Sequence, residues 1–214
     1  MSEKKSSPRP TLILVRHAHT DMAERFCGQI DPPLSPEGLT QLPELNDRLR
    51  NYSLSHIFSS DLQRARQTAE SIASRRKLPV HLLASLREIA FGSWEGLNWE
   101  QVVAHDRDYA QRWLDLYPSI PAPGGEELEH FRERIQNAVN EIALRSRGGC
   151  AVVVTHAGVI RTLTGNLTRD GNTGDFKCDY GSCFEVLRDQ QRWTLLHEIG
   201  SGSAAHETPL VISD

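Results

Sequence analysis

The sequence predicts an α/β fold built on a largely parallel β-sheet. Three observations lead to this prediction. Short runs of apolar and β-branched residues, typical of buried strands, alternate along the chain with longer stretches of helical pattern. The run Cys150–Thr155 (CAVVVT) is the most strand-like of them. Near the end of the chain, two strand-like runs are separated by a short polar turn, which indicates an antiparallel hairpin at one edge of the sheet.

Six strands are expected from these runs. In chain order they are Thr11–Val15, His56–Ser59, Val80–Leu83, Cys150–Thr155, Cys183–Leu187 and Trp193–Glu198. The first and fourth are short continuous apolar runs, a pattern that fits strands buried on both faces. Strands of this kind, alternating with helices, favour a layered α/β architecture.

The first expected helix begins at Ser35. Ser35 and Pro36 have the chemistry of an N-cap and of a first helical position, so the helix should run from there toward Asn51. Pro43 lies inside this stretch and is expected to kink the helix or to end its first part, because proline lacks the amide donor that the helix needs.

The next expected helix is capped by Asp61 or Ser60 and ends at about Arg76. Further along the chain, helical patterns of similar strength return three times. These helices are expected at Trp99–Leu116, Glu126–Arg145 and Gly158–Leu167.

The composition excludes several classes of protein. The 214 residues carry 24 Lys and Arg against 28 Asp and Glu, a formal charge of −4, so the chain has no overall attraction for nucleic acid or for an anionic membrane. No stretch reaches the roughly 18 apolar residues of a membrane span. The four cysteines form neither a CxxC pair nor a zinc-type spacing, which favours reduced thiols and a cytoplasmic protein.

One domain is expected, over residues 11–199. Residues 1–10 are charged and rich in Ser and Pro and are expected to form a disordered lead, whereas residues 200–214 are expected to form a flexible tail. Residues 99–145 are expected to form a helical cap over the functional pocket. The oligomeric state is left open by the sequence, and a homodimer is one of the states it allows.

Basic and histidine side chains follow several of the expected strands. Arg16 and His17 come directly after the first strand, and His156 comes after the fourth, just before a helix. The strand at residues 56–59 leads into a helix that carries Arg64. Because ligands of open α/β sheets bind outside the carboxyl ends of the strands, these cations are expected to meet in one local pocket. The ligand that suits such a pocket is a small dianion, most simply a phosphate.

Such a pocket could also catalyse phosphoryl transfer. A neutral imidazole is a good phosphoryl acceptor near neutral pH, and the transfer itself depends mostly on positioning and charge stabilisation. Two arginines and a second histidine can supply these without a metal ion or another cofactor. The leaving alkoxide needs a proton, for which Glu88 and Glu95 of the glycine-punctuated stretch 86–96 are the two candidates.

These residues resemble the histidine phosphatase superfamily, whose fold is called phosphoglycerate mutase-like. Four motifs match in order, over about residues 11–198. They are Arg16-His17-Ala18, Ser59–Ala69, Leu86–Gly96 and Thr155–Arg161. One such motif would be a weak signal, whereas four in the right order are a strong one. The resemblance implies a three-layer α/β/α fold, with helices on both faces of a mostly parallel sheet and an antiparallel edge strand.

The resemblance also implies the role of each residue. His17 would be the nucleophile that becomes phosphohistidine, and Arg16 and Arg64 would bind the phosphoryl oxygens. His156 would hold the same group and stabilise the transition state. Glu88, preferred to Glu95 on the motif, would protonate the leaving group and then activate water. The family uses no metal.

The substrate side of the pocket is where the chain departs from the family pattern. His19 stands where the family usually has Glu, and Ala23 stands where an Asn is often found. Together with the phosphoryl-binding residues, Gly28, Ala157 and His19 are expected to contact the substrate. The stretch 91–96 (FGSWEG) resembles phosphatases more than mutases, and the stretch 26–35 resembles the α-ribazole phosphatase branch. The expected substrate is therefore a small phosphomonoester, with α-ribazole 5'-phosphate or a broad range of esters as the two readings.

Three alternatives stay open at this point. A phosphoglycerate mutase would transfer the phosphoryl group within a sugar acid. A non-catalytic phosphate-binding protein could use the same fold. His17 and His19 also form an HxH pair, whose side chains would face one way on an extended strand as metal ligands do, so a metallohydrolase is the third.

Other residues near these motifs have simpler interpretations. Arg66 is expected on a solvated helix face, and Arg161 is expected to make a structural pair. Trp94 and Trp99 are expected to pack the loop and not to stack on a substrate.

Overall fold

The computed structural model describes residues 11–165, 176–189 and 192–200. Both the predicted disordered lead, residues 1–10, and the predicted tail beyond Gly200 lie outside the described residues. No helix in the described part of the chain is long and apolar enough to cross a membrane.

Six strands form one sheet in the order β3-β2-β4-β1-β5-β6. The strands are β1 (Thr11–Arg16), β2 (Leu54–Ser59), β3 (Val80–Leu82), β4 (Cys150–Thr155), β5 (Cys183–Asp189) and β6 (Arg192–Glu198). Neighbours among the first four strands run parallel, while β5 runs antiparallel to β1 and pairs with β6 as a hairpin. The predicted sheet, including its antiparallel edge, is therefore confirmed.

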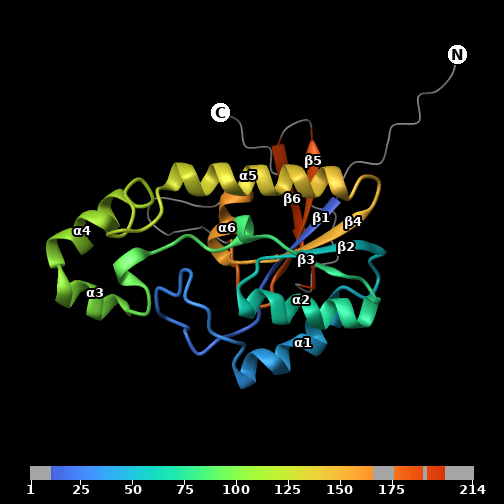
Figure 1. The fold of residues 1–214 in the computed structure, drawn as a ribbon, viewed down its shortest axis with the longest axis horizontal. Coiled ribbons are helices and arrows are strands. Elements are labelled where there is room, and N and C mark those ends of the chain that lie inside the picture. The colour runs from blue at the N-terminus through green and yellow to red at the C-terminus, as the bar shows by residue number, and fades with distance from the viewer. Residues whose placement is uncertain (1–10, 166–175, 190–191, 201–214) are drawn as a thin grey trace, which may run out of the picture.

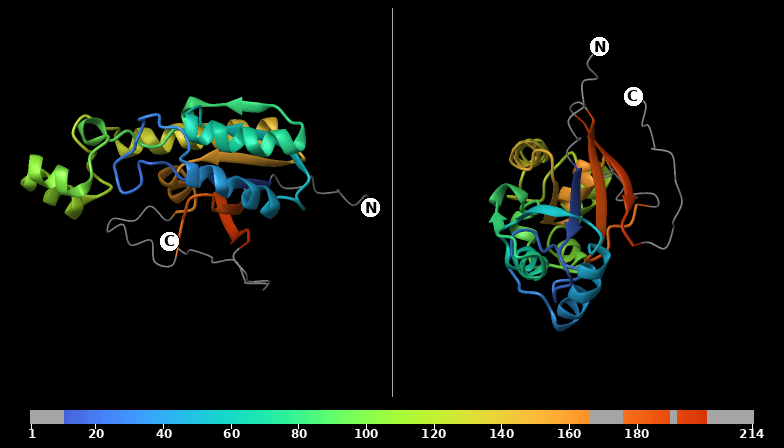
Figure 2. Two further views of the ribbon diagram at one scale, coloured as in Figure 1. Left: turned by 90° about the horizontal axis from the view of Figure 1, so that it is seen from below. Right: turned by 90° about the vertical axis from the view of Figure 1, so that its right-hand side faces the viewer.

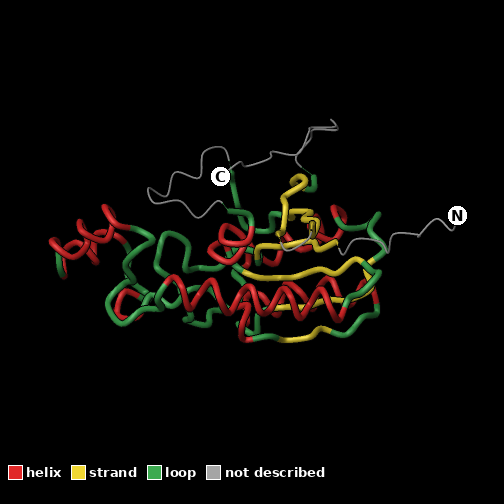
Figure 3. Tube along the Cα trace, turned by 90° about the horizontal axis from the view of Figure 1, so that it is seen from above, coloured by secondary structure: helices red, strands yellow, loops and turns green. Residues whose placement is uncertain are grey.

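Helices cover both faces of this sheet (Figure 1). They are α1 (Pro36–Arg48), α2 (Gln63–Arg76), α3 (Trp99–His105), α4 (Arg107–Leu116), α5 (Leu128–Arg145) and α6 (Ala157–Leu163). Two short 3-10 helices, η1 (Ala84–Leu86) and η2 (Gly92–Trp94), lie in the loop between β3 and α3. The right-hand view of Figure 2 shows helices on either side of the strands. Figure 3, seen from above, shows the long helix α5 lying across the strands.

The alternation of side chains along β1 explains the two layers. Leu12 and Leu14 pack with residues of α5 and α6, whereas Ile13 and Val15 pack on the other face with residues of α1 and α2. All four side chains are fully buried. Burial on both faces explains why the strand sequence is a continuous apolar run. Burying each of these side chains stabilises the folded state by about 1.5–3 kcal/mol.

Helix α1 continues through Pro43, so of the two expectations for this proline, a kink or the end of the first part, the second is wrong. Ser35 is its N-cap, as predicted, and accepts a hydrogen bond from the Gly38 amide. The helix ends at Arg48, beyond the proline, because Leu45 and the capping residue Leu49 are buried against the sheet and hold the last turn in place.

The predicted caps of α2 are wrong. The N-cap position is held by Leu62, which makes no side-chain cap. Asp61 instead forms a two-point ion pair with Arg87, at 2.6 and 2.7 Å. Asp31, from a distant loop, accepts the hydrogen bond of the Gln63 amide at the start of the helix. The first turn of α2 is thus capped by a residue that is distant in the sequence, and not by the adjacent side chain that the sequence predicts.

The segment predicted as one helix over Trp99–Leu116 is two helices. Asp106 ends α3 and caps α4, by accepting a hydrogen bond from the Tyr109 amide at 3.0 Å. Helices α3 and α4 extend away from the sheet (Figure 1). Helix α5 packs on the sheet through Ala138, Val139 and Ile142. Helix α5 is therefore part of the layer that covers the sheet, and a cap over the pocket stays a prediction for the residues before it.

Three other expected boundaries shift by a few residues. The helix expected over Glu126–Arg145 begins at Leu128, and that expected over Gly158–Leu167 begins one residue earlier, at Ala157. The latter ends at Leu163, and residues 166 and 167 of the prediction lie outside the described residues.

Candidate active site

Two histidines meet where the parallel strands β1 and β4 end. Arg16 pairs in register with Thr155, so His17 and His156 follow the two strands side by side. Their ring centroids are 5.1 Å apart. Both lie at the carboxyl edge of the sheet, where open α/β folds bind their ligands. The structure thus brings together the two histidines that the sequence predicts to converge.

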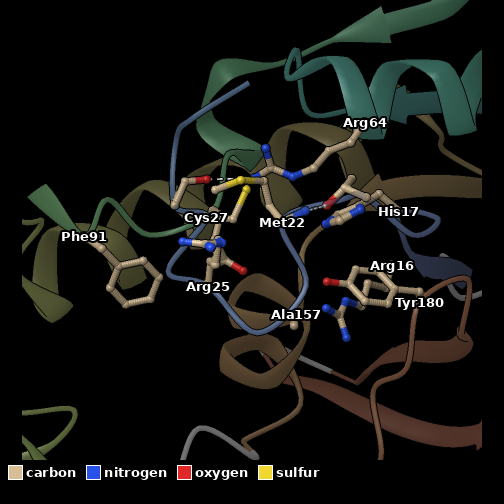
Figure 4. Close-up of a pocket in the computed structure, with 12 residues that line it drawn as sticks. Arg16, His17, Met22, Arg25, Cys27, Arg64, Phe91, Ala157 and Tyr180 are labelled. Atoms are coloured by element: carbon tan, nitrogen blue, oxygen red, sulfur yellow. Dashed lines mark hydrogen bonds between the residues drawn. The ribbon is translucent and has the colours of Figure 1, made fainter. Parts of the chain in front are cut away.

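A pocket opens beside His17 (Figure 4). Six of the residues predicted from the sequence line it: Arg16, His17, Gly28, Arg64, Glu88 and Ala157. His156 is fully buried and lies against the His17 ring without lining the pocket. His19 also lies outside the pocket lining.

The His17 ring is held in one tautomer. Its Nδ1 lies 2.8 Å from the carbonyl oxygen of Ala18, which can only accept, so Nδ1 carries the proton and Nε2 has the free lone pair. Burial, followed by the positive charges of Arg64 and Arg16, lowers the pKa of His17 well below its usual value. At neutral pH the ring is therefore uncharged, as a nucleophile must be.

The His156 ring has one bonded and one open nitrogen. Nε2 lies 2.9 Å from the hydroxyl of Ser60, the residue that follows β2, while Nδ1 is buried and has no partner among the described residues. Burial and the charge of Arg64 lower the pKa of His156 as well. A buried polar atom without a partner is unusual in a native structure and points to a ligand that would satisfy it.

Arg16 and Arg64 have no carboxylate partner among the described residues. Arg64 is 1% exposed and donates to the carbonyl oxygens of Ile30 and Gly28, at 2.6 and 2.7 Å. Arg16 donates to the carbonyl oxygen of Cys178. The Nε atoms of both arginines are buried without a partner in the described structure. Arg64 is thus a buried cation and Arg16 a partly buried one, and cations of this kind are expected to be neutralised by an anionic ligand.

Glu88 is held at the start of α6. Its carboxylate accepts hydrogen bonds from the Gly158 amide and from its own neighbour Ile89, each at 3.0 Å. Arg134 fixes the backbone of the same loop by donating to the carbonyl oxygens of Arg87 and Glu88. The carboxyl group is therefore positioned beside the pocket by two separate elements, α6 and α5.

Gly158 is required for this position of Glu88. A Cβ atom at residue 158 would lie 2.2 Å from Oε1 of Glu88, so the Gly158→Ala variant must displace the carboxylate. Because only the end of a flexible side chain has to move, thermal stability should change little. We expect kcat for alkyl phosphates to fall about 10–100-fold, the scale of a misplaced catalytic group. Steady-state kinetics and a melting curve test this, and unchanged kcat would show that the placement of Glu88 is not needed.

Glu95, the other candidate acid, has a different set of contacts. Its Oε1 accepts hydrogen bonds from the amides of Gln29 and Phe91, at 3.0 and 3.1 Å. It also sits against Gly28, where a Cβ atom would lie 2.3 Å from the same oxygen and where φ is +49°. Glu95 does not line the pocket. Glu95 therefore links its own loop to the segment that contains Gln29.

His19 contacts the wall of the pocket and not its interior. Its Nδ1 lies 2.8 Å from the hydroxyl of Ser35, and its ring packs against Tyr180 with centroids 5.0 Å apart. Tyr180 in turn stacks on the guanidinium of Arg16, at 3.8 Å, and contacts the ring of His17. His19 therefore supports the residues that shape the pocket, from behind Tyr180.

Six further residues line the pocket that the sequence interpretation did not single out. They are Thr20, Met22, Arg25, Cys27, Phe91 and Tyr180. Four of them lie on the irregular segment after β1, where neither periodicity nor a motif marks individual residues. Tyr180 comes from the loop before β5 and reaches His17 because β5 pairs with β1. No local signal in the sequence could have placed it there.

The tryptophans of the glycine-rich loop pack as expected. Trp94 is 2% exposed and sits in an aromatic cluster with Trp99, Trp113 and Phe26. This cluster joins the loop to α3 and α4. Arg66 pairs with Glu70 one helical turn away, at the surface, as expected for a solvated helix face.

The two histidines of the HxH pair have different surroundings. The Nδ1 atoms of His17 and His19 are each bonded within the protein, to Ala18 and to Ser35. In the part of the chain that the structure describes, no three His, Cys, Asp or Glu side chains are grouped as ligands for a metal ion.

This fold and this arrangement of two histidines, two arginines and a glutamate define a class of protein. The model of the histidine phosphatase superfamily (branch 1) matches residues 12–198, and the chain belongs to this family.

Several similar proteins are named as phosphatases, of different substrates. The chain is 26% identical to the adenosylcobalamin/alpha-ribazole phosphatase of Escherichia coli, over 89% of this chain and 95% of that protein. It is 31% identical to the metal-independent phosphoserine phosphatase of Arabidopsis thaliana, over 86% and 79% of the two chains. Among solved structures, mycobacterial glucosyl-3-phosphoglycerate phosphatase superposes with a TM-score of 0.75 at 27% identity, over 87% of this chain and 96% of that one.

Proposed function

We propose that this protein is a metal-independent phosphomonoesterase that hydrolyses small phosphate esters through a phosphohistidine at His17. The observation that carries the proposal is the state of the His17 ring. Its Nδ1 proton is held by Ala18, so Nε2 offers its lone pair beside two arginines, Arg16 and Arg64, that have no carboxylate partner among the described residues. A nucleophile and a site for a dianion are thus side by side.

In the first step, Nε2 of His17 attacks the phosphorus atom. The bond from phosphorus to the ester oxygen breaks, and the leaving oxygen takes the proton of the Glu88 carboxyl group. Arg16 and Arg64 stabilise the charge on the phosphoryl oxygens. In the second step, water attacks the phosphohistidine while Glu88 takes its proton, the N–P bond breaks, and inorganic phosphate leaves.

His156 has a separate part in this mechanism. Ser60 Oγ accepts from the Leu62 amide, so its own proton is free to be donated to Nε2 of His156. That leaves Nδ1 of the neutral ring as the protonated atom, ready to donate to a phosphoryl oxygen. A neutral donor here avoids a third buried positive charge next to Arg16 and Arg64.

The substrate is proposed from the relatives and from the residues. α-Ribazole 5'-phosphate is one candidate, because an α-ribazole phosphatase aligns with nearly the whole chain. Other relatives are named as phosphatases of phosphoserine and of glucosyl-3-phosphoglycerate. The proposed class of substrate is therefore phosphate esters of small polar molecules. We place the activity in the cytoplasm, in keeping with the four free cysteines.

A phosphatase screen in the presence of EDTA tests the proposal. The panel holds α-ribazole 5'-phosphate, phosphoserine, phosphoglycerates and sugar phosphates, with the His17→Ala protein as the control for contaminating activity. We expect release of inorganic phosphate that EDTA does not reduce. Loss of activity with EDTA would favour the metallohydrolase, isomerised phosphoglycerate without free phosphate would favour the mutase, and binding without turnover would favour a phosphate-binding protein.

A further inference from the structure

Arg25 is the third arginine of the pocket lining, beside Arg16 and Arg64 of the proposed phosphoryl site. Figure 4 shows it on the side of Cys27 and Phe91, whereas Arg16 and Tyr180 lie on the other side. Its side chain is exposed, unlike that of Arg64. Arg25 is therefore next to the space that the alcohol part of a bound ester would fill.

The backbone holds Arg25 firmly in this place. Its amide donates to the carbonyl oxygen of Met22, and the residue forms an antiparallel bridge with Asn98, the N-cap of α3. The next amide, that of Phe26, donates to the carbonyl oxygen of Leu97. The segment is thus paired with the residues that begin α3 and is not a loose loop.

The guanidinium of Arg25 is fixed by neutral groups alone. Its Nη1 donates to the carbonyl oxygen of Gly96, at 2.8 Å, and to the side-chain oxygen of Gln101, at 3.3 Å. Asp21 and Glu24 are close in sequence, yet Arg25 forms no ion pair with any described residue. The described residues provide acceptors for Nη1 only. Its other donors and its charge are available to a ligand.

The pocket has one more arginine than the proposed phosphoryl site uses. Its lining carries three arginines and one carboxyl group, that of Glu88. In the proposed mechanism Arg16 and Arg64 bind the phosphoryl oxygens and Glu88 faces the leaving oxygen. Arg25 is the arginine that has no part in these steps, and it lies on the side of Cys27 and Phe91.

We propose that Arg25 binds a second anionic group, a carboxylate or a second phosphate, carried by the alcohol part of the substrate. This inference rests on the proposed function, since it takes the phosphoryl group to lie at His17. It favours phosphorylated acids and bisphosphates over esters with an uncharged alcohol part, such as α-ribazole 5'-phosphate. Charge-assisted pairing of a guanidinium with a carboxylate or phosphate is the recognition that arginine suits best.

Binding to a matched pair of esters tests the proposal without requiring turnover. 3-Phosphoglycerate and glycerol 3-phosphate differ only in a carboxylate against a hydroxymethyl group. Their Kd values are measured by calorimetry in the His17→Ala background, with and without Arg25→Gln. We expect Arg25→Gln to weaken 3-phosphoglycerate about tenfold, the lower end for a hydrogen bond to a charged group, and to change glycerol 3-phosphate less than about twofold.

Two more variants and a second pair complete the design. Arg25→Lys keeps the charge and should recover part of the lost affinity, whereas Arg66→Gln makes the same change at an arginine outside the pocket and should have no effect. Fructose 1,6-bisphosphate against fructose 6-phosphate tests for a second phosphate in place of a carboxylate. A selective loss for the charged member of either pair supports the proposal and identifies the group.

An equal loss for both members of each pair would show that Arg25 only supports the loop, and no loss for any ester would show that it binds nothing. Either result overturns the proposal. Because the readout is binding, it is independent of the phosphatase screen. Failure of the proposed hydrolysis would appear as absent phosphate release by the protein with His17 intact, whatever the Kd values show.

Discussion

The His17→Ala variant is expected to lose at least about 1000-fold in kcat on p-nitrophenyl phosphate, because covalent catalysis cannot proceed without the nucleophile. No other described side chain is held in the same way, with one ring nitrogen bonded to a carbonyl oxygen and the other open beside two arginines. The loss should lie in kcat more than in KM, since Arg16 and Arg64 still bind the phosphate group.

Two further histidine variants sharpen this experiment. His105→Ala removes an exposed histidine from the end of α3 and should retain full activity. His19→Ala tests the metallohydrolase, because an HxH metal site would lose activity with either histidine. On the present account His19 only supports Tyr180, so His19→Ala retains turnover. Full turnover by His17→Ala, or equal loss from both variants, would contradict the proposed nucleophile.

The Glu88→Gln variant is expected to depend strongly on the leaving group. General acid catalysis contributes about 10²–10⁴-fold, so hydrolysis of an alkyl phosphate should slow by about that factor. p-Nitrophenolate leaves with little need of a proton and should slow far less. The measurement is kcat/KM for glycerol 3-phosphate and for p-nitrophenyl phosphate, in both the parent and the variant.

Glu95→Gln is the matched control for this prediction. Its carboxylate bonds to the amides of Gln29 and Phe91, so its loss should loosen the loop and lower kcat/KM for both esters alike. If Glu95→Gln shows the leaving-group dependence and Glu88→Gln does not, the acid is Glu95.

The sheet could be predicted from the sequence because its strands are buried on both faces. Strand β4 keeps a continuous apolar run since Val152 and Val153 pack on opposite faces, and both are fully buried. The position of His156 follows from the same pattern. It comes directly after that run, and the end of a parallel strand lies at the ligand edge whatever the rest of the chain does.

The sequence does not predict the features that depend on contacts between distant residues. The start of α2 is bonded by Asp31, about thirty residues away, which leaves Asp61 free to pair with Arg87. Two pocket residues that the sequence does not indicate are also placed by distant contacts. Tyr180 reaches His17 through strand pairing, and Arg25 is fixed through its bridge to Asn98. Such contacts have no periodicity and no fixed spacing in the sequence.

His19 is the predicted substrate contact whose surroundings depend most on distant residues. Its ring packs on Tyr180 and bonds to Ser35, the residue that caps α1. Residues further along the same segment line the pocket, among them Met22, Arg25 and Cys27. Contact of His19 with a substrate stays a prediction.

The most direct test of the central claim is to trap the phosphorylated protein. The protein is mixed with a labile phosphate ester in EDTA and quenched in alkali, and the phosphate is then mapped to a peptide and to a ring nitrogen. We predict an acid-labile, alkali-stable phosphate on Nε2 of His17, because Nδ1 is bonded to Ala18. Phosphate on another residue, or continued turnover with no phosphohistidine formed at a detectable rate, would contradict the account.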